Sequence, residues 1–447
     1  MQATLDPSTL IIPSILDGTP VSPSLPQLDI SVRAQNETFR LPLEVCELII
    51  DIAAEFWDYF DFLAQPRRTT LRSCALTCKA WLPRCRYHLF YASDLLESSE
   101  HLLGYVGMLR AHPELTSLVR RLRISGSFDD SKAYWINSLP ILLSPLLPNL
   151  NHVVYTAQVS KHLAPFHPTF FRLLSTFRPV TQLHYTCNAK QPFDNFAKFV
   201  LAFRNLERLH VDGESEWILE KPNFDQAVVE RPPLVTRRSW DKLLPLHHLH
   251  TSPYLVQRNL IHVVEFVLQR IDVTALKTIE IWDIRWREKD GEGIRAVGDL
   301  INACPNLRRV LLHITLLGGK AKNPGYISLG NNTQLRKLEL QINYLPDSLP
   351  MFQQILSSIS SPHLNHLTLR FNADARDIEH VVATSPNHID DVLTLGRFKG
   401  LNVLSTDIPA MYWPKLFRRT SQRGGLLLEQ VERMESERLH ELRHHVK

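Results

Sequence analysis

The chain has 447 residues, of which 44% are hydrophobic and 21% charged, proportions typical of a protein that buries a core. Its 50 basic and 46 acidic residues give a net charge of +4, too small to indicate a nucleic-acid or membrane partner. No apolar run approaches the roughly 20 residues that span a bilayer, and the six cysteines are expected to be reduced thiols. We therefore expect a cytoplasmic and/or nuclear protein.

Residues 1–38 are predicted to be a disordered leader. No apolar period persists there, and serine and threonine are frequent. The segment also carries five prolines, at Pro7, Pro13, Pro20, Pro23 and Pro26. Such a composition buries too little apolar surface to fold.

Residues 39–92 are predicted to form a small helical module. Pro42 suits the first turn of a helix, and Glu44 complements the positive end of its dipole. The apolar stripe of this helix consists of Val45, Leu48, Ile49, Ile52 and Phe56. After a spacer at 57–70, a second stripe consists of Leu71, Cys74, Ala75, Cys78 and Leu82. Pro83 then ends the second helix and opens a third.

Residues 93–414 carry a recurring unit with apolar residues at positions i, i+3 and i+5. The central residues of the units are Leu122, Val153, Leu183, Leu209, Ile279, Val310, Leu338 and Leu367, with weaker copies at Leu249 and Leu404. The alternation predicts a strand, and helical stretches such as 196–201 and 352–356 precede it. One strand and one helix per unit of about 30 residues bury their apolar faces only when the units stack. We therefore expect an α/β solenoid, with an insertion near 214–245.

This unit resembles the leucine-rich repeat, L-x-x-L-x-L-x-x-N/C. Three copies complete the pattern with Asn188, Asn343 and Asn372, and the resemblance implies that these side chains bond the backbone where the strand turns. Other copies carry Gln158 or Glu214 instead, so an irregular right-handed arc is expected. The alternative is a series of separate small α/β domains.

The segment from Leu41 to Phe90 resembles an F-box, in its opening Leu-Pro-Leu-Glu-Val and in the block from Leu71 to Trp81. In that family these helices bind a Skp-type adaptor, which links to a cullin scaffold. The resemblance implies adaptor-binding residues at Leu41, Pro42, Leu43, Val45, Leu48, Ile49, Leu76, Cys78 and Trp81. The spacer 57–70 departs from the family pattern because it is longer than the usual link between these helices.

An independent physical argument points the same way. About 50 residues bury too little surface to be robustly stable alone, yet the module carries more large apolar side chains than it can enclose. Either a partner protein covers the surplus, or the surplus packs on the first repeat.

No catalytic, metal or cofactor site is expected. Cys74, Cys78 and Cys85 lack a second ligand pair, and the first two lie on an apolar stripe where a thiol behaves as a small hydrophobe. His248 and His250 share one face of a strand, but no carboxylate or cysteine follows nearby, so a solvated repeat edge is favoured. Neither Gly-rich segment, near Gly291 or Gly318, completes a phosphate-binding motif.

Two further segments are interpreted from composition. The insertion 214–240 holds aromatic residues and arginines of the kind that anchor interfaces. The tail 415–447 is predicted to form a helix that caps the open end of the solenoid.

Together these patterns predict the substrate-recognition subunit of a Skp–cullin–F-box ubiquitin ligase, similar to fungal-type F-box proteins with C-terminal leucine-rich repeats. Its helices are expected to bind the adaptor and its repeats an unknown protein substrate. The alternative is a leucine-rich interaction scaffold unrelated to ubiquitination.

Overall fold

In the computed structural model, the described residues are 42–58, 64–126, 135–157, 166–187, 192–213, 243–252, 255, 257–286, 292–316, 327–343, 349–372 and 403–406. The predicted leader 1–38, the insertion 214–240 and the tail 415–447 lie outside them. Among the described helices, none is long and apolar enough to cross a bilayer.

Three helices form the N-terminal module: α1 (Leu43–Asp58), α2 (Ala64–Thr77) and α3 (Leu82–Tyr91). Their interior is a small cluster of buried side chains from all three helices, supported by partly buried neighbours. The buried members are Ile50, Ala54, Leu71 and Cys85, and the neighbours are Cys74, Ala75, Trp81 and Leu89.

Two expectations for this module need correction. The predicted spacer 57–70 is not a simple loop, because α1 runs to Asp58 and α2 begins at Ala64. Cys78 is not a core residue: α2 ends at Thr77, and Cys78 stands exposed in the turn where its carbonyl accepts from the Trp81 N–H at 3.2 Å. Two members of the predicted stripe therefore lie beyond α2, since Cys78 is in the turn and Leu82 is the first residue of α3.

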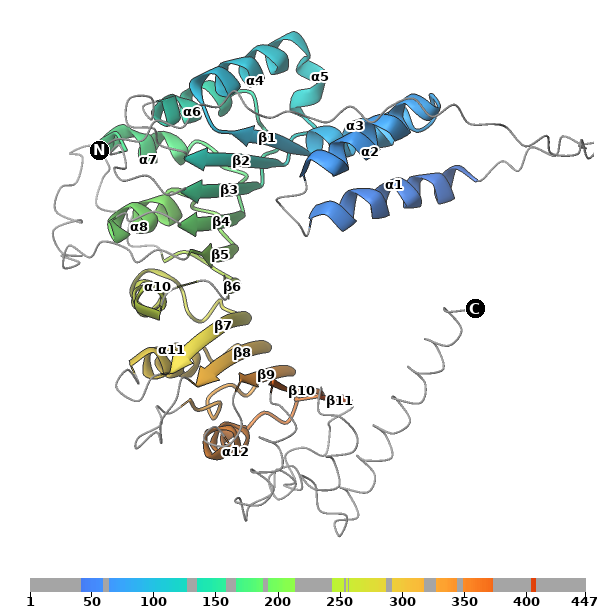
Figure 1. Cartoon of the computed structure of the whole chain (residues 1–447). Coiled ribbons are helices and arrows are strands. Elements are labelled where there is room, and N and C mark those ends of the chain that lie inside the picture. Colours follow the sequence, from blue (N-terminus) through green and yellow to red (C-terminus); the bar gives the residue numbers. More distant parts are fainter. Residues whose placement is uncertain are drawn as a thin grey trace, which may run out of the picture.

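The described part of the chain after this module is built on one sheet of eleven strands, whose spatial order is their order in the sequence. Every neighbouring pair is parallel. Figure 1 shows the strands stacked as an arc. Their bounds are β1 Ala92–Leu96, β2 Arg121–Gly126, β3 His152–Ala157, β4 Gln182–Cys187, β5 Arg208–Asp212, β6 His248–Thr251, β7 Thr278–Trp286, β8 Arg309–Leu316, β9 Lys337–Asn343, β10 His366–Asn372 and β11 Val403–Thr406.

The predicted recurrence falls into one register across this sheet. Leu122 of β2 pairs with Val153 of β3, and the row continues without a break to Leu404 of β11. The weak copy at Leu249 occupies its expected place between Leu209 and Ile279. The α/β class and the regular recurrence of the strands are therefore confirmed, and the strands are parallel.

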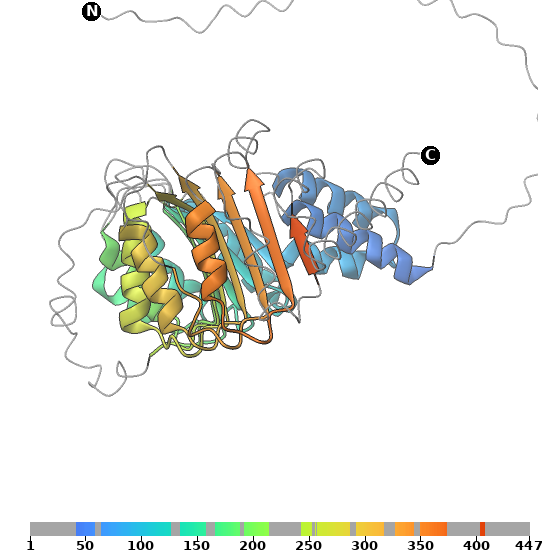
Figure 2. The ribbon, with the colours of Figure 1, turned by 90° about the horizontal axis from the view of Figure 1, so that it is seen from below.

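The helices of the array lie on the outer side of the arc, and the strands form its inner, concave face (Figures 1 and 2). Side chains that alternate along each strand point into the layer between sheet and helices, where aromatic rings such as Tyr155, Tyr185 and Phe199 pack together. The helices are α4 Ser99–Ala111, α5 Pro113–Thr116, α6 Trp135–Leu143, α7 Pro168–Leu174, α8 Phe193–Ala202, α10 Gln257–Arg270, α11 Glu292–Ala303 and α12 Leu349–Ser358.

Asparagines in the turns before the strands tie neighbouring repeats together. Asn149, Asn205 and Asn306 each donate from Nδ2 to a backbone carbonyl of the preceding repeat, at 3.0, 2.9 and 2.8 Å. This Asn-Leu pattern was a signal that the sequence interpretation missed. Of the asparagines predicted to turn the strands, Asn343 ends β9 and Asn372 ends β10, whereas Asn188 lies outside the described residues.

Strand β1 was not predicted, because its sequence interrupts the apolar alternation with Ser93 and Asp94. Its register with β2 shifts between Ala92 and Leu95. The buried Ser93 hydroxyl compensates by accepting from the Arg123 N–H at 2.9 Å. This strand joins the helical module to the array.

Candidate functional site

The outer side of α1 presents a row of large apolar side chains to solvent. Leu43, Val45, Leu48, Ile49 and Ile52 are exposed by 47, 40, 57, 47 and 57%. We call these five residues the α1 face. Four of them are spaced i, i+3, i+4 and i+7, so they share one stripe of the helix. The opposite side of α1 supplies the buried residues Cys46, Ile50 and Ala54.

The residues predicted to bind an adaptor therefore fall mainly on accessible surface. Pro42, Leu43, Val45, Leu48 and Ile49 are exposed along α1. At the end of α2, Leu76 is 88% exposed and Cys78 is also exposed. Trp81 is partly buried against the module core, and Leu41 lies outside the described residues. Ile52 belongs to the same face but was not assigned to the site.

An ion-pair network fixes the orientation of α1. The carboxylate of Asp51 accepts from Nε and Nη2 of Arg84 at 2.6 and 2.5 Å, and His88 Nε2 lies 2.8 Å from the same carboxylate. Hydrogen bonding to Arg84 is the main cause that lowers the pKa of Asp51 to about 2, and the contact with His88 acts in the same direction. Arg84 also lies over the ring of Tyr87, with 5.6 Å between the guanidinium carbon and the ring centroid.

Helix α3 connects the module to the array and leaves the α1 face uncovered. Phe90 packs against the main core, and the carbonyl of Tyr91 accepts from the Arg120 N–H at 2.9 Å. In Figure 1, α1 lies on the side of the module away from α4 and α5. The alternative in which the α1 face packs on the first repeat is therefore wrong for these five residues.

A ladder of imidazole rings crosses the concave face of the sheet. His184, His210 and His250 occupy equivalent positions on β4, β5 and β6. The ring centroids of His184 and His210 are 4.0 Å apart with an interplanar angle of 6°, and those of His210 and His250 are also 4.0 Å apart. Burial, with repulsion from the neighbouring histidines, lowers the pKa of His210 to about 2. The first two rings are therefore stacked, whereas the ring of His250 is tilted by 55° against that of His210.

At its last ring the ladder meets a carboxylate, Glu280, which also contacts an arginine. His250 Nδ1 lies 3.0 Å from Glu280 Oε2, and Arg309 Nη2 lies 3.2 Å from Glu280 Oε1. The sequence interpretation found no carboxylate near His250, because Glu280 is a full repeat away in the chain. His250 is also only partly exposed, so the expected solvated edge is wrong at this position.

The described residues contain no cluster of three or more His, Cys, Asp or Glu side chains able to hold a metal ion. The histidine spacing alone left a metal site possible at His248 and His250. In the structure, these residues lie in the middle of the sheet, where His250 bonds to Glu280 and His248 has its pKa lowered by burial.

Searches against family models and curated proteins found no match for this sequence. Among solved structures, a structural-genomics crystal structure of a protein from Bacteroides fragilis has a TM-score of 0.29 and 14% identity, covering 62% of this chain and 72% of that one. The crystal structure of the Rad7 and Elc1 complex in yeast has a TM-score of 0.29 and 12% identity, covering 81% of this chain and 92% of that one. At these scores neither likeness assigns a function.

Proposed function

We propose that this chain is the substrate-recognition subunit of a Skp–cullin–F-box ubiquitin ligase. In this proposal the N-terminal helices are an F-box that binds a Skp-type adaptor. The arc of strands and helices is an irregular leucine-rich-repeat array that binds the target protein. The observation that carries the proposal is the exposed α1 face.

The α1 face is costly to leave in water. Burying one Val, Leu or Ile side chain contributes about 1.5–3 kcal/mol relative to leaving it exposed. Five such side chains lie on a single helix of 16 residues whose inner side already supplies the module core. Apolar patches of this kind mark interaction surfaces, and an i, i+3, i+4, i+7 row suits a partner with an apolar groove.

The attachment of the module supports the same function. The network of Asp51, Arg84 and His88 holds α1 against α3, and α3 continues directly into β1 of the array. A partner bound at the α1 face is thereby held in a fixed relation to the repeats. Most of the predicted spacer 57–70 is helical, because α1 ends at Asp58 and α2 begins at Ala64.

The ligase activity then arises from proximity. The receptor holds a target lysine near ubiquitin activated on the cullin scaffold, which raises the effective concentration of the two reacting groups. The proposed role requires no catalytic residue in this chain.

Co-purification with a Skp-type adaptor tests the proposal. The full chain expressed with the adaptor is expected to elute with it on size exclusion, whereas Leu48→Asp is expected to elute apart. Leu103→Asp in α4 is the matched control, because Leu103 is 60% exposed against 57% for Leu48 and lies outside the module. If the wild-type chain elutes apart from the adaptor, or Leu48→Asp still binds it, adaptor docking at the α1 face is wrong.

A further inference from the structure

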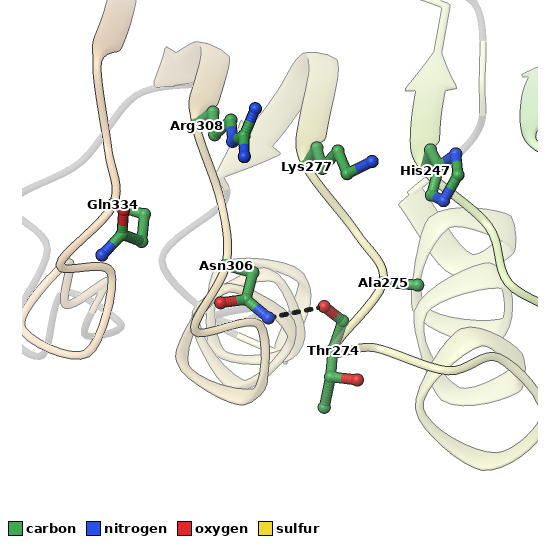
Figure 3. Close-up of a pocket in the computed structure, with 7 residues that line it drawn as sticks. All are labelled: His247, Thr274, Ala275, Lys277, Asn306, Arg308 and Gln334. Atoms are coloured by element: carbon green, nitrogen blue, oxygen red, sulfur yellow. Dashed lines mark hydrogen bonds between the residues drawn. The ribbon is translucent and has the colours of Figure 1, made fainter.

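The turns that lead into β6, β7, β8 and β9 form a small, open pocket with a basic lining. It has a volume of about 260 Å³, and its polar side chains include His247, Lys277, Asn306, Arg308 and Gln334. We call it the edge pocket. Figure 3 shows His247, Lys277 and Arg308 in one row, each on the segment that enters a strand, with Asn306 on the turn beside them.

The repeat register creates this concentration of charge. The N–H of Lys277 donates to the carbonyl of His247, the N–H of Arg308 to that of Lys277, and the N–H of Arg336 to that of Arg308. These residues are therefore neighbours on consecutive repeats, roughly 4.8 Å apart across the sheet. The row changes sign beyond His247, whose N–H donates to the carbonyl of Glu207.

The two cations of the edge pocket are available to a ligand. Among the described residues, neither Lys277 nor Arg308 lies within 4.0 Å of a carboxylate oxygen, in contrast to Arg309, which pairs with Glu280. The nearby Asp272 carboxylate already accepts from the N–H and hydroxyl of Thr274, at 3.1 and 2.6 Å. Burial lowers the pKa of the neighbouring His248, and Arg208, His247 and Lys277 act in the same direction, whereas Glu280 acts against them.

One polar side chain beside the cations is held by a hydrogen bond. Asn306 Nδ2 donates to the carbonyl of Thr274 at 2.8 Å, which fixes the turn that forms one wall (Figure 3). Gln334 occupies the corresponding turn of the next repeat and adds an amide donor. The pocket thus combines two cations with uncharged donors, and none of its described lining residues is acidic.

We propose that the edge pocket binds a phosphoryl group carried on a side chain of a peptide. A phosphoryl group has a charge near −2 at pH 7 and three acceptor oxygens, which matches two cations with flanking donors. The volume lies below the range of about 300–1,000 Å³ typical of whole small-molecule ligands, so the pocket suits one side-chain group of a longer chain. This inference concerns the array alone and does not depend on adaptor binding at the α1 face.

Phosphorus NMR of N-acetyl-phosphoserine amide titrated with the full chain tests this site. We expect a saturable line broadening, and an affinity at least about ten-fold lower in the double variant Lys277→Met, Arg308→Met. Lys198→Met with Arg258→Met is the matched control, because it removes the same charges from α8 and α10 and is expected to bind as wild type. Thermal unfolding verifies that each variant is folded, and Arg308→Gln alone, at an exposed position, serves if the double variant is not.

The ligand class is tested by competition. N-acetyl-glutamate amide at equal concentration is expected to displace little of the phosphoserine compound, because a single carboxylate carries half the charge. Equal displacement would assign the pocket to carboxylates and overturn the phosphoryl proposal. Absence of saturable broadening, or equal broadening by wild type and a folded pocket variant, would overturn the site itself.

Discussion

The carboxylate of Asp51 in α1 accepts two hydrogen bonds from the guanidinium of Arg84 in α3, at 2.6 and 2.5 Å. The two residues are 33 positions apart in the chain, and their pairing holds together the first and third helices of a module with few fully buried side chains. Because the α1 face lies on the same helix as Asp51, this pair also determines how that face is presented.

Asp51→Asn is expected to destabilise the module by about 1 kcal/mol, because the pair is charge-assisted but partly exposed. The paired carboxylate has a pKa of about 2, below its ordinary 3.8. Its stabilisation is therefore present above pH 3.8 and is lost as the pH falls toward 2. Urea unfolding of wild type and variant at pH 7 and pH 3 measures both effects. Glu44→Gln, at an exposed position of the same helix, is the control.

Truncating a side chain of α1 is expected to cost much more stability on the buried side of the helix than on the exposed side. Ile50 is fully buried, so Ile50→Ala should cost about 2–5 kcal/mol through lost burial and the cavity left behind. Leu48 is 57% exposed, so Leu48→Ala should change stability by less than about 0.5 kcal/mol. The free energy of unfolding of each variant is measured by chemical denaturation, with hydrogen exchange of the α1 amides as the readout. Similar costs at both positions would show that the α1 face is covered within the chain.

The concave face is expected to make the array sensitive to mild acid. Burial lowers the pKa of His210 to about 2 and that of His152 to about 3, whereas an unfolded histidine titrates near 6.5. The unfolded chain therefore binds more protons below pH 6.5, and stability falls as the pH drops. The loss is up to about 1.4 kcal/mol per pH unit for each such histidine.

Thermal unfolding between pH 7.5 and 5 measures this dependence. His210→Leu should give a shallower fall than wild type, because one of the groups that gain a proton on unfolding is gone. His101→Leu, at an exposed position of α4, should leave the slope unchanged. A wild-type chain that is as stable at pH 5 as at pH 7.5 would contradict the prediction.

The adjacent turn residues Asn331 and Asn332 are expected to contribute very differently to the stability of the array. Asn332 is fully buried and donates from Nδ2 to the carbonyls of Ile301 and Cys304, at 3.0 and 2.7 Å. Asn332→Ala leaves both carbonyls without this donor and should cost about 2 kcal/mol or more. Asn331→Ala removes an exposed neighbour and should cost less than half as much. Equal shifts of the unfolding midpoint in urea would exclude the buried amide as a link between repeats.

Much of the array followed from the sequence because its signal is local and repeated. The apolar triplet centred on Leu183 or Leu338 marks a strand by alternation alone, and the recurrence fixes the register once parallel stacking is assumed. Even the weak copy at Leu249 could be placed, since the neighbouring units left one gap of the right size. The apolar surplus of the helical module was visible in the same way.

Other features depended on contacts that no local pattern encodes. The sequence identified the apolar stripe of α1 but not that Ile50 and Ala54 would form the core while Leu48 and Ile52 faced solvent. Helical periodicity gives the faces of a helix, and only the positions of α2 and α3 decide which face is buried.

The sequence by itself determined the repeat, its strand positions and the excess of apolar residues near the N-terminus, because each is written in the spacing of neighbouring side chains. Tertiary structure alone decided the pairing of Glu280 with His250 and the row of Lys277 and Arg308. Residues about 30 positions apart become neighbours only when parallel strands stack in register, so their charges combine into sites that no single segment contains.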